Sequence, residues 1–557
     1  MAKQPTKAAA TPKKAVAAKP AKKATRKAVL KPQAPKAAPK ELEANKPEAA
    51  SKPAPTKATP GKAPSPRAAS RAASKPAPRP APKPKSEASA SAPPTAGQQD
   101  GAPLDLGPRE REAVRLFTLA ATHHRAGRLA DAVRGYARAL ALNPRFPDIY
   151  NNLGVALRAQ GKFDAAVACY RRALTMRPDN AGAYSNMGNA LREMGRFGLA
   201  LQCHEKAVSL RPNWAEGIYN LGLVHRDRAE TDKALAAFDR AIKINPDYVD
   251  AHWDRSLCLL QKGDFTLGFA EYDWRWKLPS NPPRRFAQPR WNGEPLKGKA
   301  LLVHQEQGFG DVIQFLRFAP EIKKLGARVI FEVQPELMRL AGTVDGIDAV
   351  VVRDGPLPAF DYWLPMLSLP ALLGTTIETI PTKIPYVSAP DVHGLRLPER
   401  DGFQRVGISW AGKATHQNDR NRSASLSDFL ELCGLMGCQF FSLQKGPPAQ
   451  QLIESGCEAL IDDLGPQFED FADTAAAMMQ LDLIITVDTA VAHLAGALGR
   501  DVWVVVPYAT DWRWLRERTD NPWYPSLRLF RQERHGDWRS VFLEVRKALQ
   551  ERLAAKS

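Results

Sequence analysis

The stretch LDLIITVDTAVAHLAGALG, residues 481–499, reads as a buried strand, a sharp turn at Asp488 and Thr489, and a helix of small residues. The strand is apolar at nearly every position, which is typical of a parallel strand covered on both faces. The turn offers two capping side chains at a helix N-terminus, whose free N–H groups and partial positive charge favour a phosphate. His493 follows Thr489 by four residues and shares its helix face. An ordinary capped helix behind a core strand explains the pattern equally well.

The same alternation of strand and helix extends through residues 299–557. Two series of strand, helix and strand predict two doubly wound, Rossmann-like domains, which we bound at 299–395 and 396–557. Ligands of such sheets bind beyond the carboxyl ends of the strands. The strands are expected at 299–305, 328–333, 349–352, 405–412, 438–446, 481–488 and 501–507, with helices between them, including 311–325 and 538–554.

Residues 106–278 repeat with a period of 34. The prolines 144, 178, 212 and 246 share this spacing, and so do the glycines 127, 161 and 195, with Ala229 breaking the series and Gly263 resuming it. The tripeptides at 152–154, 186–188 and 220–222 read NLG, NMG and NLG. This pattern resembles the tetratricopeptide repeat and predicts an all-α solenoid of four full helix pairs and a partial fifth. Such solenoids usually bind a protein or peptide in their groove; a role as spacer or dimerisation module is the alternative.

Residues 1–105 form a tail of Lys, Ala and Pro with no aromatic residue. Residues 1–100 hold 22 Lys and Arg against 5 Asp and Glu, a net charge of +17 out of +20 for the whole chain. With so little apolar surface to bury, we expect disorder. The tail could attract an anionic partner without sequence preference, either nucleic acid or a membrane surface. A solubilising role fits the same composition.

The rest of the composition predicts a cytoplasmic protein. Six scattered cysteines form no CxxC pair and no zinc motif, which favours a reducing compartment. No apolar run approaches the roughly 18 residues of a transmembrane helix, and the N-terminus lacks a signal-peptide core. The connector at 279–298 and the residues just before it carry Trp274, Trp276 and Trp291, which we expect to pack the last repeat onto the following domain.

Several motifs in one order carry a further resemblance. They are EQGFGDVIQFLRF (306–318), VGISWAGKATHQNDRNRS (406–423), FFSLQKG (440–446), DFADTAAAMMQLDLIITVDTAVAHLAGALG (470–499) and DWRWLRERTDNPWYPSLRLFRQ (511–532). With the connector, residues 270–557 resemble glycosyltransferase family 9, the heptosyltransferase-like group with the GT-B fold. The whole chain is similar to bacterial proteins that fuse tetratricopeptide repeats to such a domain. Its domain order, though not its motifs, is also similar to that of the O-linked N-acetylglucosamine transferases.

The resemblance implies transfer of a sugar from a nucleotide-sugar donor to an acceptor hydroxyl. Asp311, in a Gly-x-Gly-Asp turn, matches the family's candidate general base, and a carboxylate in a cleft can take the hydroxyl proton. Asp311 with Gln314 also reads as a helix capping box. The acceptor is either a protein held by the repeats or a glycan.

On the donor side, the resemblance implies that a nucleotide diphosphate lies against the second domain. Asp488, Thr489 and His493 match the family's Asp-Thr-x-x-x-His motif, and Arg420 and Arg422 fall where heptosyltransferases carry a Lys. The further donor-side candidates are Gln444 and Lys445, with Trp410 and Lys413 as weaker ones. No metal and no cofactor are expected, since helix dipoles and basic side chains replace the cation in GT-B enzymes. A lone basic residue on a loop is more often a solvated charge.

Four aromatic residues near the C-terminus, Trp512, Trp514, Trp523 and Tyr524, either stack on the sugar or base or pack the last segment across the domains. Two other functions stay open. The second half could be catalytically idle, with the chain acting as a scaffold through its repeats. An accessory role on nucleic acid through the basic tail is the third.

Overall fold

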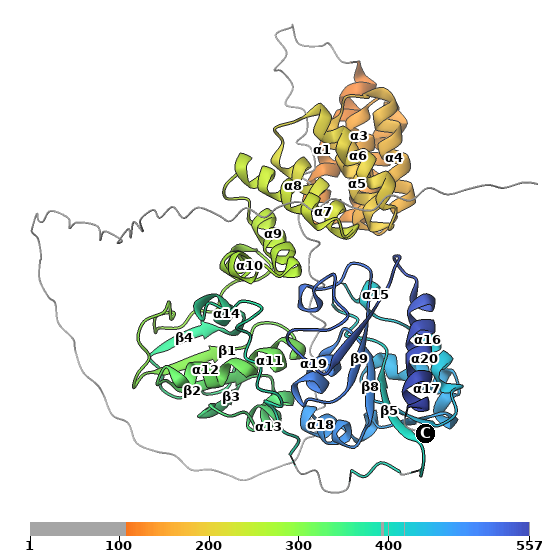
Figure 1. Ribbon diagram of the computed structural model, residues 1–557. Coiled ribbons are helices and arrows are strands. Elements are labelled where there is room, and N and C mark those ends of the chain that lie inside the picture. The colour runs from red at the N-terminus through yellow and green to blue at the C-terminus, as the bar shows by residue number, and fades with distance from the viewer. Residues whose placement is uncertain (1–106, 391–394, 399, 417, 556–557) are drawn as a thin grey trace, which may run out of the picture. The chain divides into compact units, whose positions relative to one another are not determined.

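The computed structural model describes residues 107–390, 395–398, 400–416 and 418–555. The basic tail predicted at 1–105 lies outside these residues. Three parts follow one another along the described chain: helix pairs, a four-stranded sheet and a six-stranded sheet (Figure 1). Among the helices of the described residues, none combines the length and the apolar character needed to cross a membrane.

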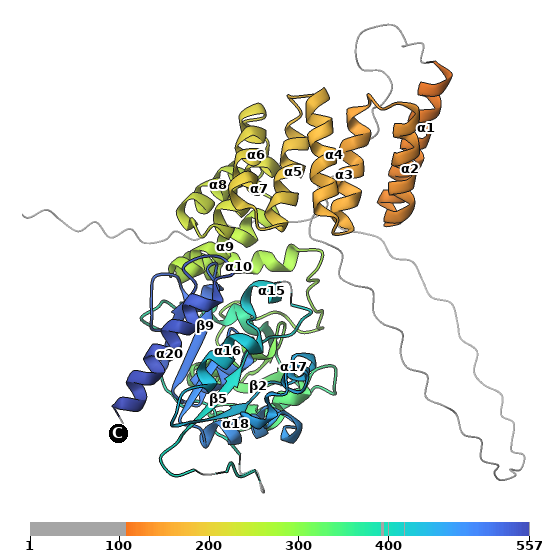
Figure 2. The same ribbon diagram turned by 90° about the vertical axis from the view of Figure 1, so that its right-hand side faces the viewer.

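The predicted solenoid is confirmed as five successive helix pairs (Figure 2), of which the last lies at an angle to the others. Within a pair, the helices join at a residue in the left-handed conformation. Gly127, Gly161 and Gly195 have φ of 72°, 74° and 73°, and Ala229 adopts φ of 58° where the glycine series breaks. The pairs are α1 (Pro108–Arg125) with α2 (Leu129–Leu142), α3 (Pro147–Ala159) with α4 (Phe163–Met176), α5 (Ala181–Glu193) with α6 (Phe197–Leu210), α7 (Ala215–Asp227) with α8 (Thr231–Ile244), and α9 (Val249–Lys262) with α10 (Phe265–Tyr272).

The glycine of each NLG or NMG tripeptide allows a large ring to approach the backbone. A Cβ on Gly154 would lie 2.5 Å from the ring of Tyr170, and a Cβ on Gly222 would lie 2.6 Å from the ring of Phe238. Each ring belongs to the second helix of the same pair and is fully buried. The small and large positions of the repeat therefore complement each other across these pairs.

The last helix pair shares a core with the sheets. Phe265 and Phe269 of α10 lie in the same apolar cluster as Trp512 and Trp523, which belong to the C-terminal part of the chain. The Phe265 ring stacks on Trp523 with centroids 5.5 Å apart. A 3₁₀ turn, η1 (Asp273–Lys277), then leads into the connector.

The first sheet is parallel, with the order β3-β2-β1-β4. Its strands are β1 (Ala300–His304), β2 (Arg328–Val333), β3 (Ala349–Val352) and β4 (Tyr362–Pro365). The other elements are α11 (Phe309–Phe315), η2 (Leu316–Phe318), α12 (Ala319–Lys324), η3 (Pro335–Leu337), α13 (Met338–Ala341), η4 (Met366–Ser368) and α14 (Leu369–Leu372). Helices α11 and α12 pack on one face, and connector residue Phe286 packs on the other face beside Leu302 and Ile330.

The second sheet is also parallel, with the order β10-β9-β8-β5-β6-β7. Its strands are β5 (Gln404–Ser409), β6 (Cys438–Ser442), β7 (Ile461–Asp463), β8 (Leu483–Val487), β9 (Val502–Val506) and β10 (Leu527–Arg531). Ile484 packs with α18 and α19, whereas Ile485 packs with α16 and α20, so successive residues of β8 face opposite helix layers (Figure 1).

The remaining elements follow or cover the strands of the second sheet. They are α15 (Asp419–Arg422), α16 (Leu426–Cys433), η5 (Pro447–Ala449), α17 (Gln450–Glu454), η6 (Cys457–Ala459), η7 (Gly465–Gln467), α18 (Phe471–Met479), α19 (Ala490–Ala497), η8 (Trp512–Trp514) and α20 (Trp538–Ala554).

The seven predicted strands are present, and the structure adds β4, β7 and β10. The predicted strand at 438–446 ends earlier, at Ser442, because residues 443–446 turn toward η5. The predicted single helix at 311–325 is instead α11, η2 and α12 in succession.

Candidate functional site

The order of the second sheet reverses between β5 and β8, and this switch point holds the motif at 481–499. The chain runs from β5 to β6 and β7 on one side, then returns to β8 on the other side of β5. The chain leaves the carboxyl end of β5 at Trp410 and that of β8 at Asp488, and from there it continues to opposite sides of the sheet. In open parallel sheets, this is where ligands bind.

Asp488 and His493 are both buried at this switch point. Burial raises the pKa of Asp488 to about 6; the charge of Asp511 adds to the rise, and Arg422 opposes it. Burial also lowers the pKa of His493 well below its usual value, and the positive charges of Arg513 and Arg317 lower it further. The imidazole is therefore neutral, with Nδ1 hydrogen-bonded to the Tyr524 hydroxyl at 3.0 Å.

Thr489 occupies the N-cap position of α19, but its side chain makes no cap hydrogen bond. Its hydroxyl lies 3.3 Å from the Thr486 hydroxyl instead. The expectation that two side chains cap this helix is therefore wrong for Thr489, because the hydroxyl turns toward the end of β8. The start of α19 also faces α11, since a Cβ on Gly310 would lie 2.7 Å from His493 Cδ2.

The two candidate arginines point in different directions. Arg422 is largely buried and donates from Nη1 to the Asp488 carbonyl oxygen at 2.9 Å, and a Cβ on Gly412 would touch its guanidinium. Arg420 is exposed and donates to the Glu193 carbonyl oxygen at the end of α5, 3.3 Å away. The structure brings Arg422 to the switch point and leaves Arg420 against the repeats.

Gln444 is buried and holds the turn after β5. Its Oε1 accepts hydrogen bonds from the backbone N–H groups of Trp410 and Ala411, at 3.0 and 2.9 Å. Its Nε2 donates to the carbonyl oxygens of Ala411 and Lys445. Backbone groups take up the hydrogen bonds of its side chain, so Gln444 fixes the conformation of this turn.

The lysine candidates lie at the surface. Lys445 is exposed and donates from Nζ to the Phe468 carbonyl oxygen. Lys413 is exposed in the loop between β5 and α15. Neither lysine is brought into the buried cluster around Asp488, whereas Trp410 is fully buried at the end of β5.

Asp311 of α11 meets the second sheet through Arg513. Arg513 Nη2 donates to Asp311 Oδ1, Nη1 donates to Asp511 at 2.9 Å, and Nε donates to the Gln314 side chain at 2.9 Å. Asp311 Oδ2 accepts from the Gly308 N–H at 2.7 Å. Asp311 does act as a capping residue, but toward Gly308, because Gln314 is directed to Arg513.

These groups form one charged cluster, which we define as Asp311, Arg422, Asp488, Asp511 and Arg513. It joins the first helix of the first sheet to the carboxyl ends of β5, β8 and β9. The sequence prediction missed Asp511 and Arg513, although both lie in a quoted motif. The available signal was their position after a predicted strand, where the loops of an open sheet meet.

Buried donors surround this charged cluster. Gln314 Nε2, Trp410 Nε1 and Trp512 Nε1 have no hydrogen-bond partner within the described chain. Buried polar groups are normally satisfied, and an unmet donor costs about 1–3 kcal/mol. A ligand rich in acceptor oxygens would satisfy them.

The four C-terminal aromatic residues are all buried, as the packing alternative predicts. Trp512 and Trp523 pack on α10, and Trp514 stacks on His493 with centroids 5.1 Å apart. Gln261 of α9 donates to the Thr510 carbonyl oxygen at 2.7 Å, next to the charged cluster. The last repeat therefore supports the loop that carries Asp511 and Arg513.

The first sheet has its own switch point, between β1 and β4, and it is filled by a side chain. Arg275 is 1% exposed and binds both oxygens of Glu306 after β1, at 2.7 and 2.9 Å. It also donates to the Ser368 hydroxyl after β4, at 2.9 Å. Glu306 in turn accepts from the Leu367 N–H at 2.9 Å.

The connector tryptophans meet their expectation in part. Trp276 lies against the buried Arg275, its ring centroid 4.5 Å from the guanidinium carbon, and Trp291 is buried where its backbone N–H donates to the Trp363 carbonyl oxygen. Trp274 instead stacks on His252 of α9, with centroids 3.7 Å apart.

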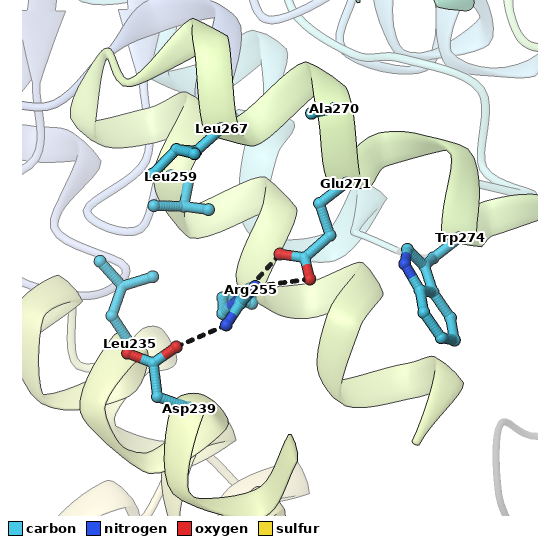
Figure 3. A pocket seen from close by; sticks show the side chains of 8 residues that line it. All are labelled: Leu235, Asp239, Arg255, Leu259, Leu267, Ala270, Glu271 and Trp274. Carbon is cyan, nitrogen blue, oxygen red and sulfur yellow. Dashed lines mark hydrogen bonds and ion pairs between the residues drawn. The ribbon is translucent and has the colours of Figure 1, made fainter. Parts of the chain in front are cut away.

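A cavity of about 420 Å³ lies in the repeats, away from the charged cluster (Figure 3). We call it the repeat pocket. One wall is polar: Arg255 lies between Glu271, which it binds through two hydrogen bonds, and Asp239. The other walls are apolar. The lining residues are Leu235, Asp239, Arg255, Leu259, Leu267, Ala270, Glu271 and Trp274.

Comparison with known proteins supports the repeats. Profiles described as TPR repeat match residues 122–158 and 156–195, and a tetratricopeptide-repeat profile matches 179–247. The curated protein FlbA of Caulobacter vibrioides is 26% identical over 327 residues, covering 53% of this chain and 54% of FlbA. The chain thus spans about half the length of this curated relative.

Two solved structures are similar to part of this chain. MamA 41-end from Desulfovibrio magneticus RS-1 is 21% identical, with 32% of this chain and 99% of MamA covered and a TM-score of 0.29. PilF of Pseudomonas aeruginosa is 19% identical, with 40% and 89% covered and a TM-score of 0.31. By its sequence profiles and its helix pairs, this chain carries tetratricopeptide repeats.

Proposed function

We propose that this chain is a glycosyltransferase that moves a sugar from a nucleotide-sugar donor to an acceptor hydroxyl, through a GT-B domain of the family 9 type. The observation that carries the proposal is the charged cluster. It joins Asp311, from the motif with the candidate base, to the Asp488 motif and Arg422 at the switch point of the other sheet. Two motifs of the resemblance that lie far apart in the chain thus meet at one place.

In this proposal each charged group has a chemical role. The acceptor oxygen attacks the anomeric carbon, the bond from that carbon to the diphosphate breaks, and its electron pair stays on the diphosphate. Asp311 takes the hydroxyl proton, and Arg513 keeps this carboxylate oriented. Arg422 and the N-terminus of α19 offset the charge that develops on the leaving group. No metal or cofactor is part of the scheme.

The donor is expected to bind against the second sheet, beside the neutral His493 and Thr489. Gln314 Nε2 and Trp410 Nε1, which have no partner among the residues that the structure describes, suit the oxygens of a sugar diphosphate. A donor of this kind fits a cytoplasmic location, which we propose with it.

Tetratricopeptide repeats suggest a protein-interaction role, and the repeat pocket favours a second candidate function. It combines an apolar wall, where Leu267 is 57% exposed, with the polar wall of Arg255 and Asp239. In the glycosyltransferase proposal, a protein or peptide bound there is the acceptor. In the alternative, the chain is a scaffold whose second half does not turn over a substrate.

Nucleotide binding to the full chain tests the proposal. Thermal unfolding is measured with ADP, UDP, GDP and CMP and with their sugar conjugates, because a ligand that binds only the folded state raises the unfolding temperature. We expect one nucleotide to raise it, and Thr489→Val to remove most of the rise while keeping the side-chain shape. Asp311→Asn should keep nucleotide binding and lower sugar transfer by about 10²- to 10⁴-fold.

The matched control is Asp345→Asn, an exposed carboxylate of the first sheet that pairs with Lys383. It should change neither binding nor transfer. If no nucleotide shifts the unfolding temperature, the enzyme proposal is wrong and the scaffold remains. Leu267→Asp would then be the variant that abolishes capture of a peptide partner.

A further inference from the structure

The repeat pocket lies on the outer side of the solenoid. Its walls come from the second helices of the fourth and fifth pairs, α8 and α10, and from α9 between them. Successive first helices, such as α5 and α7, pack on one another, whereas successive second helices approach each other less closely. In a curved stack, the elements that lie closer together form the inner side. The pocket is therefore separate from the inner, concave surface on which such solenoids usually bind their partners.

The charged side chains that line the pocket are bonded to one another, and Asp239 alone among them keeps an open oxygen. Arg255 donates from Nε and Nη2 to the two oxygens of Glu271, and from Nη1 to Asp239 Oδ1, each at 2.7 Å. Glu271 also shares a hydrogen bond with His252. The Asp239 side chain is 59% exposed, and its second oxygen is open. Since two carboxylates face one guanidinium among the lining residues, the pocket carries a net negative charge that is accessible at Asp239.

The remaining walls of the pocket are apolar and open to solvent. Leu267 and Ala270 of α10 are exposed, and Leu235 and Leu259 are partly exposed (Figure 3). The volume of about 420 Å³ falls within the roughly 300–1,000 Å³ that is typical of ligand sites. An apolar side chain placed there would remove the leucines from water, which is favourable.

Trp274 closes one end of the pocket, and both faces of its ring are covered. The His252 ring stacks on it with centroids 3.7 Å apart and planes 4° from parallel. Lys277 Nζ lies 3.4 Å from the centre of the same ring, so it covers the opposite face. A cationic ligand therefore finds no open aromatic face at Trp274. Within the pocket, Asp239 is left as the group that attracts a positive charge.

We propose that the repeat pocket binds a peptide segment of a partner protein in which an apolar side chain stands next to a lysine or arginine. The apolar side chain lies against Leu259 and Leu267, and the basic group pairs with Asp239. An acidic peptide or a phosphate would meet this carboxylate with the same charge, so it is not the expected ligand. This role rests on the second candidate function, peptide binding by the repeats, and it does not require sugar transfer.

Calorimetric titration of the full chain with three capped peptides tests this specificity. Their central triads, each between glycines, are Lys-Leu-Lys, Glu-Leu-Glu and Lys-Ser-Lys. We expect the Lys-Leu-Lys peptide to bind most tightly. Serine in place of leucine removes the apolar side chain and should weaken binding about tenfold or more. Glutamate in place of lysine should weaken binding about fivefold at low ionic strength, and added salt should reduce this difference.

Two substitutions in the apolar wall test the place of binding. Leu267→Asp puts a charge into the wall, and Ala270→Trp fills the cavity with a ring, so each should weaken binding of the Lys-Leu-Lys peptide about tenfold or more. Both positions are exposed, so thermal unfolding should show that both variants fold like the natural chain. The matched control is Leu199→Asp on α6, an exposed leucine outside the pocket, which should leave peptide binding unchanged.

A third substitution tests the charge. Asp239→Asn keeps the shape of the side chain and removes its charge, so the Lys-Leu-Lys peptide should bind up to about fivefold more weakly and the Glu-Leu-Glu peptide more tightly. The matched control is Asp232→Asn on the same helix, an exposed carboxylate that pairs with Lys262 outside the pocket. This control should change the binding of neither peptide.

Absence of binding by the Lys-Leu-Lys peptide, equal binding of the three peptides, or binding that Leu267→Asp leaves unchanged overturns the proposal. If the Glu-Leu-Glu peptide binds most tightly and Leu267→Asp has no effect on it, the repeats bind their partner elsewhere, and the scaffold function stands without this pocket. If sedimentation shows a dimer that Leu267→Asp abolishes, a second copy of the chain occupies the pocket, and the peptide assignment is wrong. Nucleotide binding should be the same in Leu267→Asp as in the natural chain, which separates failure of this pocket from failure of the proposed donor site.

Discussion

The two sheets have equivalent switch points that are used in opposite ways. Between β1 and β4, the crevice is filled by Arg275, which is bound to Glu306 and Ser368 with its hydrogen bonds made. Between β5 and β8, Asp488 is buried beside another carboxylate, and nearby donors have no partner in the described part of the chain. Topology alone thus marks two places for a ligand, but the chain itself satisfies one of them. Unbalanced charge and unmet donors distinguish the place where we propose that a substrate binds.

The largest effect is expected at the filled crevice. Arg275→Met leaves the buried Glu306 carboxylate without its counter-charge, so the free energy of unfolding should fall by about 3–5 kcal/mol. Urea unfolding of the full chain, followed by tryptophan fluorescence, measures the change. In the double variant with Glu306→Gln, the charge is gone and the Leu367 N–H keeps an acceptor, so part of the loss should return. If Arg275→Met alone were as stable as the natural chain, the ion pair of Arg275 and Glu306 would not be what stabilises this crevice.

A substitution in the crevice between β5 and β8 should instead raise the stability of the protein. The folded-state pKa of Asp488 is raised to about 6, so the folded protein holds this proton more tightly than the unfolded chain does. The free energy of unfolding therefore falls as the pH rises through 6 and Asp488 ionises. Asp488→Asn should stabilise the protein by about 2–3 kcal/mol at pH 8 and by almost nothing at pH 4. The same gain at both pH values would contradict a charge effect at this site.

The smallest effect is the expected difference in nucleotide binding between substitutions of Arg422 and of Arg420. Arg422→Gln should weaken binding of the nucleoside diphosphate about tenfold, or roughly 1.4 kcal/mol, by removing one positive charge at the switch point. Arg420→Gln should leave it unchanged, because that side chain contacts Glu193. Titration of both variants with the same nucleotide measures the difference. Equal losses would mean that the loop between β5 and α15 rearranges on binding.

Most of the fold could be predicted from the sequence because its signals are local. The 34-residue period reflects contacts between units that are neighbours in the chain. The long apolar runs reflect strands that are buried on both faces. Two of the three strands that escaped prediction lack such signals: β7 has three residues, of which two are aspartates, and β4 has four, ending in proline. Their places are set by pairing with β6 and β1.

The candidate site could be predicted only in part, since its contacts join distant segments. Asp311 and Arg513 are 202 residues apart, and no spacing rule connects them. Gln444 shows a second limit of the sequence signal. Its place after a strand suggested a ligand contact, but backbone groups of the neighbouring turn take up its hydrogen bonds. The roles that the resemblance assigns to Asp311, Asp488, Thr489 and His493 stay predictions.

The packing of α10 on Trp512 and Trp523 also limits how this protein can change in length. An array of repeats usually gains or loses whole units, because each unit contacts only its neighbours. Here the fifth pair has neighbours of two kinds, and Gln261 ties it to the loop beside the charged cluster. Insertion or deletion of a unit at that end would uncover two tryptophans and disturb the loop. Over evolutionary time, the array is therefore free to lengthen or shorten only from its first pair onward, with the fifth inherited as part of the sheets.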